Sequence, residues 1–540
     1  MSTQVSFAAV VAAFVQAAIA QTPPSFDRPA ANEFVTVSDG RFLLGGRPHY
    51  FAGVNFWQAM NLAVDGPGGD RARLQAELDQ LRQLGVTNVR IMAASEGPNT
   101  EPYRMVPALM PSPGMYDPNV LDGLDYLLAQ IGQRGMRAVM VLNNYWQWSG
   151  GMAQYVSWHE GTPIPYPPEY GWAAFMAYAA KFYGYEPCQT WYRSHIEAIV
   201  TRTNPYTGLA YRDDPTIFAW ELANEPRSYP AEWIDDTAAY IKSLDVNHLV
   251  TTGSEGSVGG AFVSTHDGPH IDYATVHIWP QNWGWYDPES PATYPTAEAN
   301  ARSYLQTHLI DAAVLGKPLV LEEFGLARDF EPLHDIYDPN APTTFRDLFY
   351  EAMFDEVFTW ASVGGPAAGD NIWAWSGQGR PGDEWTGDPP HEVPGWYSVY
   401  DTDTTTLAVV SVHAAEMVSI SGSFLLAVEV VNEPWGSVEL VPEPNDANAP
   451  AYPFGTTVTL TAIPMNGRTF GRWEIYDPNH PGDANYAVVD SNNPITVVMC
   501  ADREVTAVFK CGEGAGVSLL PLIGVVFVVF LHRRLGAVAA

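Results

Sequence analysis

Hydrophobic and polar residues follow two different rhythms along residues 50–376. Short runs rich in β-branched and aromatic residues predict strands, and segments between them, such as 70–84 and 121–131, carry leucines at helical spacing. The pattern predicts strands at 50–56, 88–92, 137–143, 217–222, 248–253, 273–277, 318–323 and 371–375. Strand–helix alternation repeated in this way is typical of a closed parallel (β/α)8 barrel, or TIM barrel. An open doubly wound α/β sheet is the alternative, but no glycine fingerprint follows the first strand.

The pattern changes after residue 402. A threonine-rich stretch at 402–406 and a segment rich in proline and asparagine at 441–453 precede short runs of alternating residues, such as 456–461 and 496–499. Alternation with turn residues between the runs predicts a small antiparallel β module. We therefore place the barrel at 32–402 and the β module at 405–510.

The N-terminal segment predicts export. Residues 1–20 are uncharged and largely apolar, and they end in Ala18-Ile19-Ala20, which matches a signal peptide with a small-x-small cleavage site. A short buried helix is the alternative. We expect a secreted protein.

The C-terminal segment, residues 511–540, predicts an anchor. An apolar run at 517–531 is followed by His532-Arg533-Arg534, as in a transmembrane span with its basic end in the cytoplasm. Cys511-Gly512-Glu513-Gly514 resembles the motif of bacterial C-terminal sorting tails, which a sorting enzyme processes. A plain membrane tail with an incidental cysteine is the alternative. We expect the protein to be held at a bacterial cell surface.

Composition narrows the class of partner. The 540 residues include 61 Asp and Glu against 27 Lys and Arg, so the net charge is 27 − 61 = −34. A content of 46% hydrophobic and 13% aromatic residues excludes a disordered acidic chain. Nucleic acid needs a basic surface, so we expect no nucleic-acid partner. Sixteen of the 18 tryptophans lie between Trp57 and Trp396, where their flat faces suit sugar stacking as well as core packing.

Carboxylates follow two of the predicted strands. Strand 217–222 leads into Asn224-Glu225-Pro226, and strand 318–323 ends in Glu322-Glu323. The carboxyl ends of barrel strands converge on one face, where active sites form. Glycoside hydrolysis needs two such carboxylates, because one protonates the leaving oxygen and the other attacks the anomeric carbon or activates water. Surface acids in an acidic chain are the alternative reading of either motif alone.

The ordered motifs of this region resemble glycoside hydrolase family 5, a family of retaining (β/α)8 enzymes, and specifically its endo-β-1,4-mannanase branch. The resemblance covers about residues 32–400. It rests on segments spread over the whole barrel, at 52–57, 89–91, 141–145, 153–156, 211–217, 220–227, 277–283 and 321–325.

The resemblance implies roles for individual residues. It puts the acid/base on Glu225 and the nucleophile on Glu323, with their carboxyl groups about 5–5.5 Å apart. It implies an aromatic platform under the reactive sugar at Trp375 and a ligand of the sugar 2-hydroxyl at Asn224. The full set of implied substrate-binding residues is Trp57, Arg90, Asn143, Asn224, His277, Trp279 and Trp375. Core packing is the alternative for Trp57 and Trp375.

The two carboxyl groups need different protonation states. We expect Arg90 to lower the pKa of Glu323, and the ionised nucleophile to raise the pKa of Glu225 so that it keeps its proton. No metal ion and no cofactor is expected to take part.

The chain departs from the family pattern at His277-Ile278-Trp279, where most relatives have His-x-Tyr with a phenol that hydrogen-bonds the nucleophile. An indole N–H can only donate, so Trp279 either keeps that role as a donor or lines a subsite. Asn143-Asn144, where several cellulases of the family carry histidine, favours mannan over cellulose.

These features lead us to expect a monomer that hydrolyses internal β-1,4-mannosidic bonds of mannan, glucomannan or galactomannan with retention. A β-1,4-glucanase of the same family and a non-catalytic polysaccharide-binding barrel are the alternatives.

The β module resembles internalin-type repeats, which favours a structural spacer over a sugar-binding module. Asn432-Glu433-Pro434 in that module repeats the tripeptide at Glu225 but has no partner carboxylate in barrel register, so it is expected to be a turn.

Overall fold

The computed structural model describes residues 28–30, 33–431, 433–444, 450–453, 456–476, 488–499 and 502–511. The predicted signal peptide and the predicted membrane tail beyond residue 511 lie outside the described residues. Within the described ranges, every helix is too short or too polar to cross a bilayer.

Eight parallel strands surround a common axis, as the sequence predicts. They pair in the order β8-β7-β6-β5-β4-β11-β10-β9. The two end strands are linked by hydrogen bonds from Thr251 Oγ1 to the Tyr273 carbonyl (2.9 Å) and from Thr275 Oγ1 to the Ser254 carbonyl (3.0 Å). The strands are β4 (Phe51–Asn55), β5 (Asn88–Met92), β6 (Arg137–Val141), β7 (Ile217–Glu221), β8 (Leu249–Thr251), β9 (Ala274–Ile278), β10 (Leu319–Phe324) and β11 (Ala367–Ile372).

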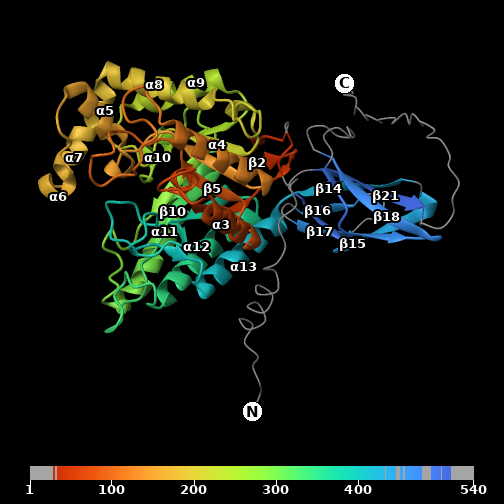
Figure 1. The fold of residues 1–540 in the computed structure, drawn as a ribbon. Helices are drawn as coiled ribbons and strands as arrows, with labels where there is room; N and C mark the ends of the chain where they lie inside the picture. The colour runs from red at the N-terminus through yellow and green to blue at the C-terminus, as the bar shows by residue number, and fades with distance from the viewer. Residues whose placement is uncertain are drawn as a thin grey trace, which may run out of the picture.

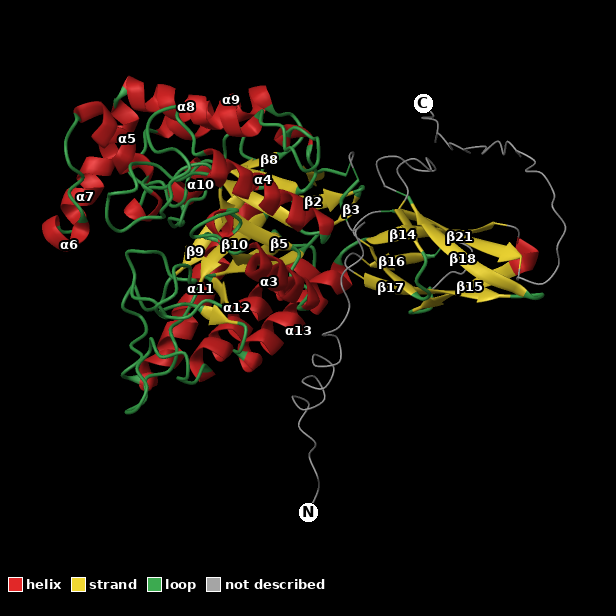
Figure 2. Cartoon of the chain, viewed as in Figure 1, coloured by secondary structure: helices red, strands yellow, loops and turns green. Residues whose placement is uncertain are grey.

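Helices return the chain after each strand and cover the outside of the sheet (Figures 1 and 2). The apolar face of each helix packs on the strands, which places the core between the two layers. These helices are α3 (Arg71–Gln83), α4 (Pro118–Gln133), α8 (Glu186–Val200), α9 (Ala231–Leu244), α10 (Gly260–His266), α11 (Tyr294–Leu315), α12 (Thr344–Ser362) and α13 (Thr404–Ile420). The long connection after β6 adds α5 (Gly151–Glu160), α6 (Pro167–Tyr170) and α7 (Trp172–Ala179), which project at one edge of Figure 1.

A small N-terminal sheet packs at the amino end of the barrel. It consists of β1 (Val35–Ser38), β2 (Arg41–Leu44) and β3 (Arg47–Pro48). The ring of Phe42 contacts Phe218 and Tyr273 edge-on, with centroids 5.0 and 5.3 Å apart. These apolar contacts fill the end of the barrel opposite the strands' carboxyl ends, so polar side chains at the carboxyl ends are left to form a site.

The eighth strand lies earlier than predicted, and this changes the role of Trp375. The strand β11 occupies Ala367–Ile372, whereas the sequence predicts a strand at 371–375. The prediction is late because the small and polar residues of β11 give a weak strand pattern and the aromatic run after them gives a stronger one. Trp375 belongs instead to β12 (Trp375–Gly377), which pairs with β13 (Val399–Tyr400). Its side chain is fully buried, and its Nε1 donates to Glu77 Oε2 of α3 at 3.0 Å. The expectation that Trp375 forms the sugar platform is therefore wrong.

The barrel also extends beyond the predicted boundary at residue 402. Residues expected at the start of the β module form α13, which packs against α12 and β4. His413 of α13 pairs with Asp370 of β11 at 2.6 Å and stacks on Phe354. The threonine-rich stretch, at which the sequence pattern predicts the end of the barrel, contains the N-cap residue Asp403 and the first residues of this helix.

The C-terminal β module begins at residue 423. It contains β14 (Ser423–Val431), β15 (Gly436–Val441), β16 (Ala451–Pro453), β17 (Thr456–Pro464), β18 (Arg468–Ile475), β19 (Val488–Asp490), β20 (Ile495–Met499) and β21 (Arg503–Cys511). Most neighbouring strands are antiparallel, as predicted, but β14 and β21 pair in parallel. Glu433 and Pro434 lie in a short 3-10 turn between β14 and β15, in agreement with the predicted turn.

The burial of Trp375 gives a stability prediction. Trp375→Ala should lower the free energy of unfolding by about 3–5 kcal/mol, because it leaves a cavity and an unpaired Glu77 oxygen. Urea denaturation followed by circular dichroism measures the change. Leu333, whose surface is 88% exposed, is the control, and Leu333→Ala should change stability by about 0.5 kcal/mol or less. A loss below about 1 kcal/mol for Trp375→Ala would contradict its assignment to the core.

Candidate active site

Glu225 and Glu323 lie together at the carboxyl end of the barrel. Glu323 is part of β10, and Glu225 follows β7 with its backbone in the left-handed region (φ 47°) and its N–H bonded to the Gly253 carbonyl at 2.8 Å. One oxygen of Glu225, one oxygen of Glu323 and one ring nitrogen of His277 all lie within 4.8 Å of one another. Two carboxylate oxygens this close favour the short carboxyl spacing of retaining glycosidases over the spacing of 6.5–9.5 Å between the carboxyl groups of inverting enzymes.

His277 bridges the two carboxylates from β9. Its Nδ1 lies 2.8 Å from Glu225 Oε1 and 3.4 Å from Glu323 Oε2. Its Nε2 lies 3.4 Å from Glu322 Oε2, so the ring is held from both sides. Glu322 thus lies beneath His277 as a supporting group, whereas Glu225 and Glu323 reach the cavity.

Arg90 of β5 carries the positive charge at the centre of the site. Its guanidinium is 3% exposed and forms a bidentate pair with Glu221, at 2.7 Å from Nε to Oε2 and 2.6 Å from Nη2 to Oε1. It also donates to Glu323, to Asn224 Oδ1 at 2.8 Å and to Asn55 Oδ1 at 3.0 Å. The predicted contact between Arg90 and the nucleophile position is present in the structure.

The charges of this cluster shift the pKa values of His277 and Glu225. Burial alone lowers the pKa of His277, but the charges and hydrogen bonds of Glu323, Glu225 and Glu322 outweigh it and raise the pKa to about 10. Burial alone raises the pKa of Glu225, but the hydrogen bond and charge of His277, the charge of Arg227 and the hydrogen bond from Trp146 lower it to about 2. A protonated His277 between two carboxylates is the resulting arrangement.

The expected order of the two carboxyl pKa values is therefore reversed in the free protein. Arg90 and His277 act to lower the pKa of Glu323, but burial outweighs them and raises it. Glu225 is the group with the lowered pKa, because two donors point at its two oxygens: His277 Nδ1 at 2.8 Å and Trp146 Nε1 at 2.7 Å. The sequence did not reveal Trp146 as a donor, so its effect was missed.

The three ligand atoms of Glu225, His277 and Glu323 are close enough to surround a cation. The groups around them are better suited to stabilising two carboxylates than to holding a metal ion. Arg90 donates to Glu323, and Trp146 donates to Glu225, so the nearest outer groups present positive charge and N–H donors. Such groups stabilise carboxylates that hold no metal ion.

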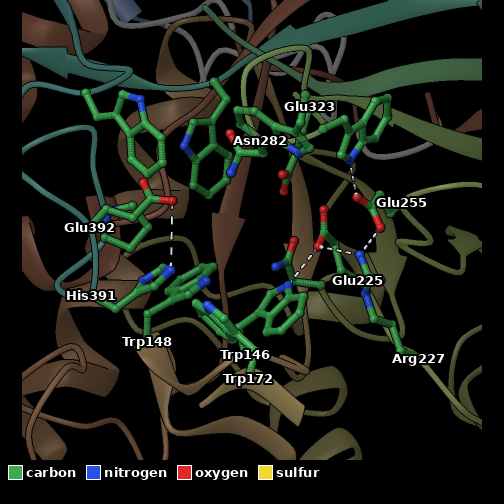
Figure 3. Close-up of a pocket in the computed structure, with 16 residues that line it drawn as sticks. Trp146, Trp148, Trp172, Glu225, Arg227, Glu255, Asn282, Glu323, His391 and Glu392 are labelled. Carbon is green, nitrogen blue, oxygen red and sulfur yellow. Dashed lines mark hydrogen bonds and ion pairs between the residues drawn. The ribbon is translucent and has the colours of Figure 1, made fainter. Parts of the chain in front are cut away.

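Tryptophans line the cavity in front of the carboxylates (Figure 3). The cavity encloses about 480 Å³, within the usual range for small-ligand sites. Its walls come from loops after several strands, and the lining residues are Trp146, Trp148, Trp172, Asn224, Glu225, Arg227, Glu255, Trp279, Asn282, Trp283, Glu323, Trp373, Pro389, His391, Glu392 and Trp396. Flat apolar faces beside a few polar groups suit the binding of a neutral sugar.

The structure brings some of the predicted binding residues to this cavity and buries others behind it. Asn224 and Trp279 line it, and Arg90 and His277 lie directly beneath. Trp57 is 3% exposed, and its Nε1 donates to the Gly387 carbonyl at 2.8 Å, so it packs in the core. Asn143 is buried as well, and its Oδ1 accepts the N–H of the next residue at 2.8 Å. Trp57 and Asn143 therefore contribute to the shape of the site without lining the cavity.

Trp373 takes the place that the sequence interpretation gave to Trp375. It follows the end of β11 and lines the cavity, with its ring 5.8 Å from that of Trp279. Trp279 packs between Trp373 and Tyr397, 5.0 Å from the latter. Of the two roles considered for Trp279, the lining of a subsite is the one that this packing supports.

Several lining residues were missed by the sequence interpretation. Correct placement of the eighth strand would have pointed to Trp373, because it is the first residue beyond the strand. The run Trp146-Gln147-Trp148 after β6 was a signal for the aromatic wall. His391 and Glu392 lie in the long loop between β12 and β13, where no pattern distinguishes lining residues from surface residues.

The barrel and its paired carboxylates define a glycoside hydrolase. Residues 32–421 match the family model described as GH family 5 beta-mannosidase-like, and the chain belongs to this family. Residues 426–513 match a model described as Divergent InlB B-repeat domain, in agreement with the resemblance of the β module.

Similar proteins include plant and microbial enzymes. Mannan endo-1,4-beta-mannosidase 1 of Solanum lycopersicum is 32% identical over 368 residues, which cover 64% of this chain and 84% of that protein. The crystal structure of a glycoside hydrolase family 5 mannosidase from Rhizomucor miehei is 40% identical with a TM-score of 0.70, and the match covers 73% of this chain and 99% of that one. An endo-1,4-beta-D-mannanase from Thermotoga petrophila is 26% identical with a TM-score of 0.52, and the match covers 68% of this chain and 99% of that one.

Replacement of Glu323 tests the assignment of the nucleophile position. Glu323→Ala should lower turnover by roughly 10³-fold or more, because no other described carboxylate in the cavity takes its place, while oligosaccharide binding stays largely intact. Steady-state kinetics and calorimetric titration measure the two effects. Glu356→Gln, which removes a carboxylate paired with Arg302 on the outer helices, is the control and should keep near-normal activity. Near-normal activity of Glu323→Ala would remove Glu323 from the mechanism.

Proposed function

We propose that this protein hydrolyses internal β-1,4-mannosidic bonds of mannan, glucomannan or galactomannan with net retention. The observation that carries the proposal is the pair Glu225 and Glu323, bridged by His277 at the mouth of the barrel inside a tryptophan-lined cavity. The relative from Solanum lycopersicum bears the name mannan endo-1,4-beta-mannosidase 1, which supports mannan as the substrate class.

The proposed reaction proceeds in two displacements. Glu323 attacks the anomeric carbon while Glu225 gives a proton to the departing oxygen, and a glycosyl ester on Glu323 results. A water molecule then gives its proton to Glu225 and displaces the sugar from Glu323, which restores both groups. Asn224, fixed by Arg90 at 2.8 Å, lies in the cavity wall where it can hydrogen-bond a sugar hydroxyl.

The proton for the first step is stored beside the acid. In the free protein His277 holds it, because the pKa of His277 is raised to about 10 and that of Glu225 is lowered to about 2. Transfer across the 2.8 Å hydrogen bond from Nδ1 to Glu225 Oε1 gives a neutral imidazole and a protonated carboxyl group. The two groups then titrate as a pair, and the pH profile reports the pair.

Release of single mannose units from chain ends is a second candidate. The loop between β12 and β13 adds a polar wall to the cavity, with Pro389, His391 and Glu392 among the lining residues. A wall across the strand ends limits how far a sugar chain extends past the carboxylates. The solved structure with 40% identity bears the name mannosidase, whereas the endo-mannanase from Thermotoga petrophila is 26% identical.

The products of mannohexaose distinguish these candidates. Internal cleavage should give mannobiose, mannotriose and mannotetraose at early times and a fast loss of galactomannan viscosity, whereas cleavage from the end should give mannose from the start. Chromatography of a time course measures the products. Carboxymethyl cellulose is the control substrate, and activity on it alone would replace the mannan proposal by a β-1,4-glucanase. Absence of turnover on every β-glycan would favour a binding barrel.

We also propose that the protein is exported and anchored at a bacterial cell surface, with the β module as a spacer. The support is the sequence of residues 1–20 and 511–540 and the match of residues 426–513 to an InlB repeat. A spacer of this kind would carry the cavity away from the membrane and towards a polysaccharide too large to be imported.

Truncation tests the anchor. A chain that ends before Cys511 should appear in the culture medium as active enzyme, while the full chain should stay with the cell envelope. Fractionation with an activity assay measures the distribution. A truncated chain that remains with the membrane would contradict the role of the tail.

A further inference from the structure

A second charged pair lies beside the acid/base, on the side opposite His277. Arg227 follows Glu225 by two residues, and its guanidinium forms an ion pair with Glu255 from the loop after β8. The same guanidinium nitrogen lies 3.8 Å from Glu225 Oε2, too far for a hydrogen bond. Figure 3 shows the guanidinium between the two carboxylates, with a dashed line to each, of which the one to Glu255 is the shorter contact.

Glu255 and Trp146 both restrict where Arg227 can go. Glu255 also accepts from Trp283 Nε1 at 3.3 Å, which fixes the carboxylate against the cavity wall. Arg227 lies over the ring of Trp146, 5.2 Å from its centroid, and Trp146 Nε1 donates to Glu225 Oε2. Oε2 of Glu225 therefore already accepts from one neutral donor, Trp146. Glu255 and Glu225 compete for the charged donor, Arg227.

This competition has a consequence for acid catalysis. An arginine in direct contact with a carboxylate holds it ionised and so opposes its protonation. Arg227 held on Glu255 lowers the pKa of Glu225 through its charge alone, without the direct hydrogen bond that would lower it further. Burial and the charge of Glu225 raise the pKa of Glu255 to about 7, so above neutral pH Glu255 is ionised and binds Arg227 most strongly.

Other titratable groups face Glu225 from the surrounding elements. They are His277 of β9, Glu323 of β10, Tyr304 of α11 and Glu392 of the loop after β12. None of these four groups can restrain Arg227 as Glu255 does, because the ion pairs of Arg227 join it to Glu255 and Glu225.

We propose that Glu255 is a positioning residue that holds Arg227 away from direct contact with Glu225, a contact that would oppose protonation of the acid/base during turnover. The inference rests on the proposed function only for the role of Glu225 as acid. It does not depend on which β-glycan is the substrate. Glu255 acts through Arg227 and needs no contact with the reacting atoms.

The proposal predicts opposite pH shifts for its two residues. Glu255→Gln removes a negative charge and frees Arg227 to bind Glu225, so the proton is lost more easily and the alkaline limb of kcat/KM moves to lower pH. Arg227→Gln removes the positive charge, so the limb moves to higher pH. Each shift should be about one pH unit, as expected for a charge within 4–6 Å. The double variant should return the limb close to that of the unmodified protein.

The experiment measures kcat/KM against pH for these three variants on whichever β-glycan the unmodified full chain hydrolyses. Glu356→Gln, which breaks a comparable ion pair on the outer helices, is the matched control and should leave the limb in place. Thermal unfolding and circular dichroism confirm that each variant is folded. A variant that does not fold is replaced by Glu255→Ala or Arg227→Lys, for which Glu255→Ala moves the limb to lower pH and Arg227→Lys leaves it nearly unchanged.

Two results would overturn the proposal. Single variants that shift the limb in the same direction would show that Glu255 and Glu225 do not compete for Arg227. Lower activity of the Glu255 variant with an unmoved limb would show that Glu255 only shapes the cavity. Failure of the proposed function gives a different result, because the unmodified chain would then hydrolyse no β-glycan and have no limb to measure.

Discussion

The site depends on the buried guanidinium of Arg90. Three carboxylates, those of Glu221, Glu322 and Glu323, lie within 4 Å of it in the interior of the barrel, where unpaired charges are costly. The bidentate pair with Glu221 fixes the plane of the guanidinium, and the remaining donors then fix Asn55, Asn224 and Glu323. One cation thus neutralises the charge of the site and orients the side chains that point into the cavity.

Around that centre, each polar group has two functions, because it both supports the fold and prepares the chemistry. His277 ties β9 to the loop after β7 and to β10, and it also holds the proton next to Glu225. Trp146 forms part of the aromatic wall, and its N–H stabilises the ionised carboxylate. Such sharing explains why a change in one residue affects several others.

The sequence predicted the order of the strands, the pair Glu225 and Glu323, and the presence of Arg90 and His277 at the site, because these depend on strand periodicity and on ordered motifs. It could not locate the start of the eighth strand, because Ala367-Ala368-Gly369-Asp370 is weakly strand-like. The sequence interpretation therefore assigns the role of the sugar platform to Trp375, whereas Trp373 lines the cavity. The burial of Trp57 and the loop that brings Glu392 to the cavity result from long-range packing, which no local pattern carries. The protonation of Glu225 was misjudged for the same reason, since Trp146 and Arg227 reach it through space.

The left-handed backbone of Glu225 has a further consequence. Residues with a side chain pay about 1 kcal/mol or more to adopt this conformation, and glycine or asparagine adopts it more easily. The turn places the carboxyl group beside His277, so the position most important for turnover is also one at which the chain is less stable than it could be. Selection for heat resistance and selection for catalysis therefore act against each other at this residue, and gains in robustness are easier to make elsewhere in the barrel.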